Sequence, residues 1–185
     1  EFFTNELLIL VSLVDQNKLD YKTLYGSWAG AFGFFQFMPS TIKNHAIDFN
    51  QDNHIDLKNP NDAYASAANY LNNIGWKKNS HCFYKISLNK NISEKYLNVS
   101  AKKLVNKRKL KYFKKYISNF ENLDFVDENL KVAIITPDKD IVPDAQTLKP
   151  AYIVFENYEI ILKWNRSLRF ALAVCTLKDK IKNEI

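Results

Sequence analysis

The apolar residues near both ends of the chain recur with the spacing of an amphipathic α-helix. Near the start, positions i, i+3, i+4 and i+7 are occupied by Leu7, Leu10, Val11 and Val14. With Thr4 as a candidate N-cap, this pattern predicts a helix over residues 3–14. The same spacing returns near the other end of the chain, in Phe170, Ala173, Val174, Leu177 and Ile181. It predicts a helix over residues 167–182.

Boundary signals predict two more helices. Ser40 is suited to cap a short helix over residues 41–47. Asn59 and Pro60 supply the N-cap and the first position of another helix, and Gly75 is suited to end it.

Apolar and polar residues in the middle of the chain alternate with a period near two, which indicates strands. The segments concerned are residues 82–88, 131–136, 151–156 and 158–164, with a tight hairpin turn expected over 155–158. Residues 93–119 carry helical patterning instead. Helices at both ends of a strand-rich middle predict an α+β fold. The expected division is a helical core from residues 1–78 and 164–185, and a smaller strand-rich lobe with a basic helical segment from residues 79–163.

Composition narrows the class of protein. The 185 residues suit one domain with a small appended lobe, and no apolar run reaches the roughly 18 to 20 residues that span a bilayer. A formal net charge of +6 favours anionic partners such as nucleic acid, anionic lipid or an acidic polysaccharide. Cys82 and Cys175 do not have CxxC spacing. The first interpretation is that both are small buried side chains, and the alternative is that they form a single disulfide.

Glycine and aromatic residues are concentrated in one stretch. Residues 26–33 hold three of the four glycines, and aromatic residues follow directly. Ser27 and Gln36 are polar positions inside this stretch, and Asn165 adjoins Trp164 near the last helix. Aromatic walls with a few amide or hydroxyl groups suit sugar rings, although Asn165 also fits a simple helix cap.

The loop over residues 48–62 has the oxygen spacing of an EF-hand. Side chains at relative positions 1, 3, 5 and 9 carry oxygen, and position 7 would offer the backbone carbonyl of His54. Asn53 replaces the usual glycine, and Asn59 replaces the usual bidentate glutamate. Asp62, on the first turn of the next helix, could supply that missing carboxylate. The pattern favours weakly bound calcium, and a solvated turn rich in Asn and Asp is the alternative.

The remaining polar residues exclude several chemistries. The chain has no GxSxG, P-loop, GxGxxG or HExxH motif, which leaves hydride transfer, nucleotide hydrolysis and zinc proteolysis without support. The lysine-rich run over residues 102–115 is interpreted as the solvated face of an amphipathic segment, with a nucleic-acid patch as the weaker alternative.

Together these motifs resemble the membrane-bound lytic transglycosylase B family, which cleaves bacterial murein. The resemblance covers nearly the whole chain, is tight over residues 26–76 and 164–174, and is loose over 79–157. It rests on GSWAGAFG (26–33), QFMPS (36–40), AIDF (46–49), IDL (55–57), NPNDA (59–63), AANYL (67–71), GW (75–76), WNRS (164–167) and ALAV (171–174).

The resemblance implies a lysozyme-like helical core with an inserted small antiparallel β lobe and an EF-hand-like calcium loop. The implied calcium ligands are Asp48, Asn50, Asp52, the His54 carbonyl and Asp62. The implied substrate-binding residues are Ser27, Gln36, Asn165 and Phe170. Phe170 stands where the family often has a tyrosine, and Phe35 replaces a small residue, which would narrow a subsite.

The implied reaction cleaves the β-1,4 bond between N-acetylmuramic acid and N-acetylglucosamine. One Glu protonates the glycosidic oxygen and then takes a proton from the muramoyl 6-hydroxyl, which forms a 1,6-anhydro end. By the same resemblance this Glu lies upstream of residue 1, so neither Glu1 nor Glu6 is assigned to catalysis. The resemblance also implies a periplasmic protein, with a lipid anchor to the outer membrane left open. A peptidoglycan-binding module without catalysis is the alternative function, and nucleic acid is not expected as a partner.

Overall fold

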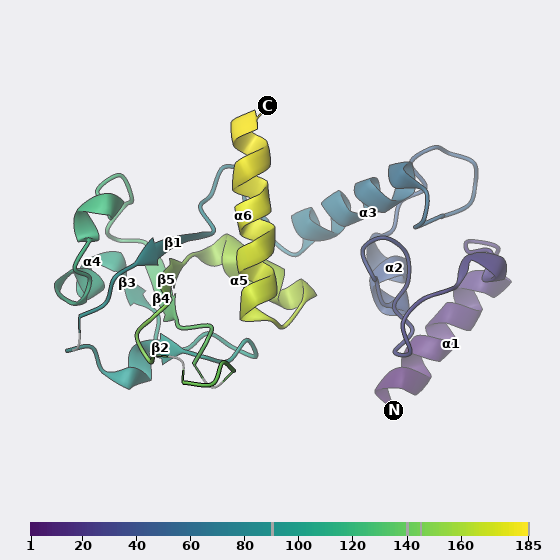
Figure 1. Ribbon diagram of the computed structural model, residues 1–185. Helices are drawn as coiled ribbons and strands as arrows, with labels where there is room; N and C mark the ends of the chain where they lie inside the picture. The colour runs from purple at the N-terminus through teal and green to yellow at the C-terminus, as the bar shows by residue number, and fades with distance from the viewer. Residues whose placement is uncertain (90, 140, 145, 185) are drawn as a thin grey trace. The chain divides into compact units, whose positions relative to one another are not determined.

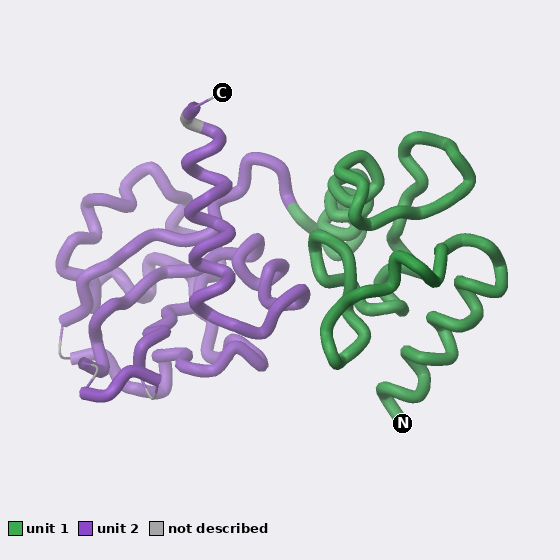
Figure 2. The backbone as a smooth tube through the Cα atoms, turned by 45° about the vertical axis from the view of Figure 1, so that its right-hand side comes forward, with its two compact units in different colours: residues 1–76 green, residues 77–185 purple. Residues whose placement is uncertain are grey.

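The computed structural model describes residues 1–89, 91–139, 141–144 and 146–184. The chain forms two compact units, Glu1–Trp76 and Lys77–Ile185 (Figure 2). This division differs from the expected one, because residues 164–185 group with the strand-rich segment rather than with residues 1–78. None of the helices that the structure describes is long and apolar enough to cross a membrane.

Unit 1 is helical, as predicted, and contains α1 (Phe2–Asp15), η1 (Tyr21–Thr23), α2 (Pro39–His45) and α3 (Pro60–Asn73). Helix α2 begins earlier than predicted, with Met38 as its N-cap residue. The predicted capping role of Ser40 is wrong, because Ser40 lies inside the helix and its hydroxyl donates to Glu6. The buried apolar side chains of this unit are Leu13, Leu19, Phe32, Phe37, Ile42, Leu57, Ala63 and Ala67.

Helix α3 confirms the predicted boundary chemistry. The Asn59 side chain accepts a hydrogen bond from the backbone N–H of Asn61, and Pro60 follows as the first helical residue. Gly75 has φ +104°, the left-handed conformation that ends many helices.

Unit 2 is built around a mixed sheet (Figure 1). Within the described residues its strands are β1 (Phe83–Ile86), β2 (Leu97–Asn98), β3 (Arg108–Lys109), β4 (Lys131–Ile135) and β5 (Ala151–Val154). The order is β1-β5-β4-β2, and β3 also pairs with β4. The expected purely antiparallel lobe is therefore wrong in one respect, because β2 pairs with β4 in parallel, with Leu97 opposite Ile134.

The predicted strand over residues 158–164 and the predicted hairpin turn over 155–158 are wrong. This segment is helix α5 (Glu156–Trp164), and its N-cap residue is Phe155. The alternation of polar and apolar residues suggested a strand, but Tyr158, Ile161 and Leu162 also fit the helical spacing i, i+3, i+4. All three side chains are buried in unit 2. Residues 158–164 fit both strand alternation and helical spacing, and the burial of these side chains selects the helix.

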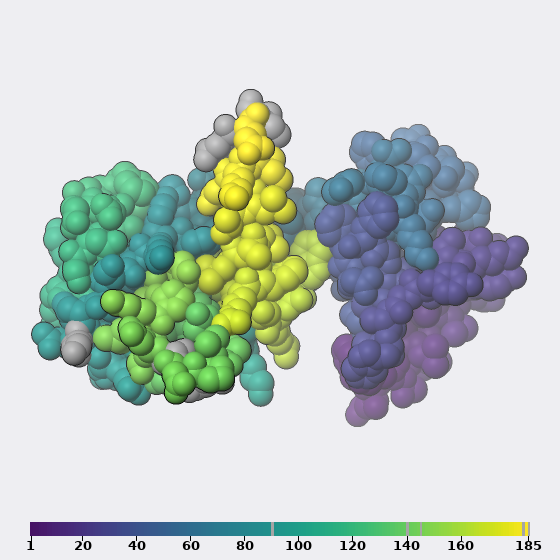
Figure 3. Space-filling view, viewed as in Figure 1, coloured from purple at the N-terminus to yellow at the C-terminus, as the bar shows by residue number. Residues whose placement is uncertain are grey.

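Helix α6 (Leu168–Glu184) confirms the predicted terminal helix and is attached to the rest of unit 2. Cys175 on α6 forms a disulfide with Cys82, which directly precedes β1. The first interpretation of the cysteines was therefore wrong, and the alternative, a disulfide, is correct. The buried Tyr158 hydroxyl donates to the Leu168 carbonyl at 2.6 Å and ties α5 to the start of α6. Helix α6 lies at the surface of unit 2, where it is drawn in yellow (Figure 3). Leu177 is among its exposed residues.

Residues 93–119 do not form the long helix that their patterning suggests. They contain only short elements: η2 (Glu94–Tyr96), β2, β3, α4 (Leu110–Phe113) and η3 (Lys114–Tyr116), followed by η4 (Phe120–Leu123). The core of unit 2 takes side chains from these short elements and from Ile117, which follows η3; those from the elements include Tyr96, Leu97, Leu110, Phe113, Phe120 and Leu123. Tertiary burial therefore overrides local helical propensity in this segment.

Candidate functional site

A compact loop between η1 and α2 carries two of the predicted substrate-binding residues. Its backbone folds on itself through isolated β-bridges between Gly26 and Phe32 and between Phe32 and Phe37. A Cβ on Gly26 would overlap the Ala31 carbonyl, and a Cβ on Gly33, whose φ is +76°, would overlap Leu57. The concentration of glycine noted in the sequence is therefore a requirement of this tight fold.

Ser27 and Gln36 lie on this loop and are both exposed. The Ser27 hydroxyl accepts a hydrogen bond from the Ala31 N–H at 3.1 Å, and the Gln36 side-chain amide donates to the Gly33 carbonyl at 3.0 Å. Gln36 has φ +51°, a conformation that costs free energy in a residue other than glycine. The loop thus holds both polar side chains at fixed positions on the surface.

Exposed aromatic residues lie next to Ser27 and Gln36 along the chain. Trp28 is 92% exposed, and Tyr25 and Phe34 are also largely exposed. Phe35 instead packs edge-on against Tyr64 of α3, with ring centroids 5.4 Å apart. Exposed ring faces beside amide and hydroxyl groups are the chemistry that binds sugar rings.

Glu6 was not predicted to have a role, and the structure gives it one. Only 6% of its surface is exposed, and its carboxylate accepts hydrogen bonds from the N–H and the hydroxyl of Ser40, at 2.8 and 2.6 Å. It thereby joins α1 to the first turn of α2, directly after the loop that carries Gln36. Its position in line with Leu10 and Leu13, at i, i+4 and i+7, was the available signal that it faces inward.

The loop over residues 48–62 curls inward through its polar side chains. Asp48 accepts hydrogen bonds from the N–H groups of Asp52 and Asn53, and Asp52 accepts one from the His54 N–H at 2.8 Å. Asn50 accepts a further one from Asp52. The His54 hydrogen bond, followed by that from the Asn50 amide, holds the pKa of the Asp52 carboxyl below its ordinary value.

Asp62 is fully buried and joins the two sides of the same loop. Its oxygens accept hydrogen bonds from the N–H groups of Phe49 and Asp56, both at 2.9 Å. Among the residues that the structure describes, no group of three His, Cys, Asp or Glu side chains is arranged to hold a metal ion. The all-oxygen donor set suits calcium chemically, but Asp62 is engaged by the backbone and does not join Asp48 and Asp52.

The other two predicted substrate-binding residues belong to unit 2, at the junction of α5 and α6. Asn165 is the C-cap residue of α5 and is exposed, and its carbonyl accepts a hydrogen bond from Ser167 at 2.8 Å. The Ser167 hydroxyl accepts from the Phe170 N–H at 3.2 Å, so Ser167 caps α6 and the Asn165 side chain does not. Phe170 is 38% exposed. Ser27 and Gln36 thus lie on one loop of unit 1, and Asn165 and Phe170 lie at one helix junction of unit 2.

A family model described as the Transglycosylase SLT domain matches residues 1–179. The chain therefore belongs to the transglycosylase SLT domain family. The α+β fold with its small sheet agrees with this assignment.

Individual relatives come from two bacteria. Membrane-bound lytic murein transglycosylase B of Escherichia coli (strain K12) is 45% identical over 78 residues, which is 42% of this chain and 22% of that protein. The soluble lytic transglycosylase SltB1 of Pseudomonas aeruginosa covers all of this chain with 25% identity and a TM-score of 0.78, over 58% of its own length.

Two further solved structures contain bound molecules. SltB3 of P. aeruginosa, in complex with NAG-anhNAM-pentapeptide, has a TM-score of 0.76 and 27% identity over 96% of this chain and 45% of its own. E. coli Slt35, in complex with calcium, has a TM-score of 0.73 and 24% identity over 99% of this chain and 54% of its own. The chain spans about half the length of these solved structures.

Proposed function

We propose that this chain is part of a lytic transglycosylase that cleaves the MurNAc–GlcNAc β-1,4 bond of peptidoglycan and leaves 1,6-anhydromuramoyl ends. The observation that carries the proposal is the strained loop of residues 26–37, which presents Ser27 and Gln36 among exposed aromatic rings in a member of the transglycosylase SLT domain family.

In this proposal the residues of the chain bind and orient the glycan. Gln36 and Asn165 carry amides that both donate and accept hydrogen bonds, which suits hydroxyl and acetamido groups, and Ser27 adds a hydroxyl. Phe170 offers a partly exposed ring for stacking. The sugar's own 6-hydroxyl is the nucleophile, so the reaction needs one carboxyl group as acid and then base, and no attacking water.

Glu6 is not suited to be that carboxyl group. Both of its oxygens accept hydrogen bonds from Ser40, and the carboxylate is committed to joining α1 and α2. A general acid must present a proton to the substrate oxygen, whereas each Glu6 oxygen already accepts a hydrogen bond within unit 1. From the family resemblance, we propose that the acid is a glutamate outside residues 1–185.

The proposed location is the periplasm, with membrane attachment, if present, through a lipid anchor outside this chain. The disulfide between Cys82 and Cys175 supports an oxidising compartment, because disulfides persist there and are rare in the cytosol. Fractionation of the native host, with a cytosolic and an outer-membrane marker, tests this placement.

The activity test uses the full-length protein and purified peptidoglycan sacculi, with released fragments analysed by mass spectrometry. Anhydromuropeptides, each lighter by one water than a hydrolysis product, are expected. Gln36→Ala should lower their release about tenfold, because one hydrogen bond to substrate is worth about 1–1.5 kcal/mol. Gln146→Ala, an exposed glutamine in unit 2, is the matched control. Binding to sacculi without any anhydro product would instead support a non-catalytic peptidoglycan-binding module.

We further propose that the loop over residues 48–62 binds calcium weakly through Asp48, Asn50, Asp52, the His54 carbonyl and Asp62. The inward-turned side chains support this, and binding would require Asp62 to release or share its backbone hydrogen bonds. With a Kd near 1 mM, typical of extracellular modules, 10 mM calcium would stabilise the fold by about 1.4 kcal/mol.

Thermal unfolding with calcium, magnesium or EDTA tests the calcium site. The expected result is a rise in Tm with calcium that Asp48→Asn combined with Asp52→Asn abolishes. Asp124→Asn, an exposed carboxylate of unit 2, should retain the full shift. Equal shifts with calcium and magnesium in all three proteins would contradict the site.

A further inference from the structure

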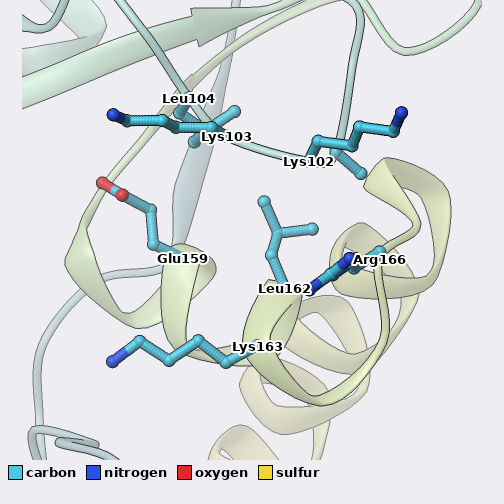
Figure 4. A pocket seen from close by; sticks show the side chains of 8 residues that line it. Lys102, Lys103, Leu104, Glu159, Leu162, Lys163 and Arg166 are labelled. Atoms are coloured by element: carbon cyan, nitrogen blue, oxygen red, sulfur yellow. The ribbon is translucent and has the colours of Figure 1, made fainter. Parts of the chain in front are cut away.

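Unit 2 contains a cationic pocket that the proposed function does not use. The pocket has a volume of about 320 Å³ and lies between the segment Ala101–Leu104 and the end of α5 (Figure 4). Lys102, Lys103, Lys163 and Arg166 line it, against one carboxylate, Glu159. Figure 4 shows Arg166 and Leu162 among the side chains that line the pocket. Ligand pockets in proteins begin at about this size.

A buried asparagine fixes the segment that forms one side of this pocket. The Asn98 side chain accepts a hydrogen bond from the Val105 N–H at 2.7 Å and donates to the carbonyls of Ile134 and Val105, at 2.9 and 3.3 Å. Residues 99–104 are therefore a loop whose ends are tied to β4. This attachment holds residues 99–104 out of a regular helix, and Lys102 and Lys103 line the pocket from this loop.

The positive charge of the pocket is only partly neutralised. Glu159 is paired with Lys107, at 2.9 Å. In the described part of the chain no acidic side chain forms an ion pair with Lys102, Lys103 or Arg166. Like charges gathered around a concave site raise the local concentration of anions.

The floor of the pocket is apolar, because Leu104 and Leu162 line it and are themselves buried. A cationic rim over an apolar floor suits a short ligand that combines carboxylates with methyl groups. Neutral sugar rings do not need such a rim, and a nucleic-acid duplex would contact an extended basic surface rather than a pocket of this size.

We propose that this pocket binds the carboxylate-bearing peptide of peptidoglycan, the part of the substrate that corresponds to the pentapeptide in the SltB3 complex. The inference rests on the proposed function and names a second part of the same substrate. Arg166 directly follows Asn165, the residue proposed to bind the sugar, so one junction offers an amide to the glycan and a cation to the attached peptide. Arg166 and Lys103 are the principal ligands of the peptide carboxylates.

The test measures binding of two ligands to the full-length protein by isothermal titration calorimetry at low salt. One ligand is NAG-NAM-pentapeptide, and the other is the NAG-NAM disaccharide without peptide. The variant is Lys103→Glu combined with Arg166→Glu, and Lys109→Glu combined with Lys111→Glu is the matched control from the same basic run. Lys103→Gln combined with Arg166→Gln is a milder second variant in case the charge reversal impairs folding, which circular dichroism checks.

The expected result is that the charge-reversed protein binds the pentapeptide ligand about tenfold more weakly, because two attractions become two repulsions. Its affinity for the disaccharide should be unchanged, and the control variant should bind both ligands as the original protein does. Unchanged affinity for the pentapeptide ligand in both pocket variants would overturn the peptide assignment and leave the proposed function intact.

Two other outcomes would also overturn it. Loss of salt-dependent binding to a short DNA duplex in the pocket variant, with unchanged pentapeptide affinity, would assign the pocket to nucleic acid. Failure of the original protein to bind either ligand would overturn the proposed function itself and the peptide assignment with it.

Discussion

Loss of the Cys82–Cys175 disulfide is expected to destabilise unit 2 strongly. The two cysteines are separated by 93 positions in sequence, so the bond closes a loop that contains nearly the whole unit. Both residues are buried, one directly before β1 and the other in the middle of α6. The perturbation is Cys82→Ala combined with Cys175→Ala, compared with the original protein under oxidising conditions.

The magnitude follows from the entropy that the cross-link removes from the unfolded chain. For a loop of 93 residues the chain-entropy relation gives about 16 cal/mol/K, or about 4.6 kcal/mol at 25 °C. Measured effects are usually smaller, so a loss of about 3–4.5 kcal/mol is expected. Domains of this size are stable by about 5–15 kcal/mol, and the loss is therefore a large share of the total.

Urea unfolding followed by circular dichroism and tryptophan fluorescence measures this loss. The alanine variant should unfold at a lower urea concentration, and dithiothreitol should shift the original protein in the same direction but leave the variant unchanged. Because both cysteines are buried, reduction in native buffer should occur only as fast as unit 2 opens. A difference below about 1 kcal/mol, or rapid reduction without unfolding, would refute this reasoning.

The remaining predictions concern three polar residues. Glu6→Ala should cost about 2–3 kcal/mol because it removes two charge-assisted hydrogen bonds, and a double-mutant cycle with Ser40→Ala should show coupling rather than additivity in urea unfolding. Asn157→Ala should cost a similar amount, because its buried side chain accepts from the Lys77 N–H and donates to the Lys77 carbonyl, and a urea midpoint equal to that of the original protein would contradict this. The Asp52 carboxyl should titrate in NMR spectra with a pKa below its ordinary value. Its stabilising hydrogen bonds are present at neutral pH and are lost as the pH falls through that lowered pKa. A titration midpoint at or above pH 3.8 would contradict the loop geometry.

These predictions bear on function through the loop of residues 26–37. Glu6 holds the start of α2, and α2 begins two residues after Phe37, where the loop ends. A Glu6 variant that folds should therefore weaken glycan binding as well as stability, since Gln36 would lose its fixed position. The conservative Glu6→Gln change retains one acceptor oxygen. It should therefore lose less stability and less glycan affinity than Glu6→Ala.

Features that depend only on neighbouring residues could be predicted before the fold was known. The periodicity of α1 and α6, the Asn59 and Pro60 start of α3, and the glycine requirement of residues 26–33 are all local and could be predicted. The motifs of residues 26–76 and 164–174 also carried the resemblance to the family that the family model later matched.

Long-range packing was needed wherever a local pattern fitted two structures or where residues distant in sequence meet. Residues 158–164 alternate like a strand, but the burial of Tyr158, Ile161 and Leu162 makes them a helix. The disulfide joins cysteines 93 positions apart, and no local signal distinguishes a paired from an unpaired buried cysteine. Glu6 meets Ser40, and Asn98 meets Val105 and Ile134, through long-range folding. A polar side chain is buried only where the fold supplies its partner, and sequence spacing does not contain that information.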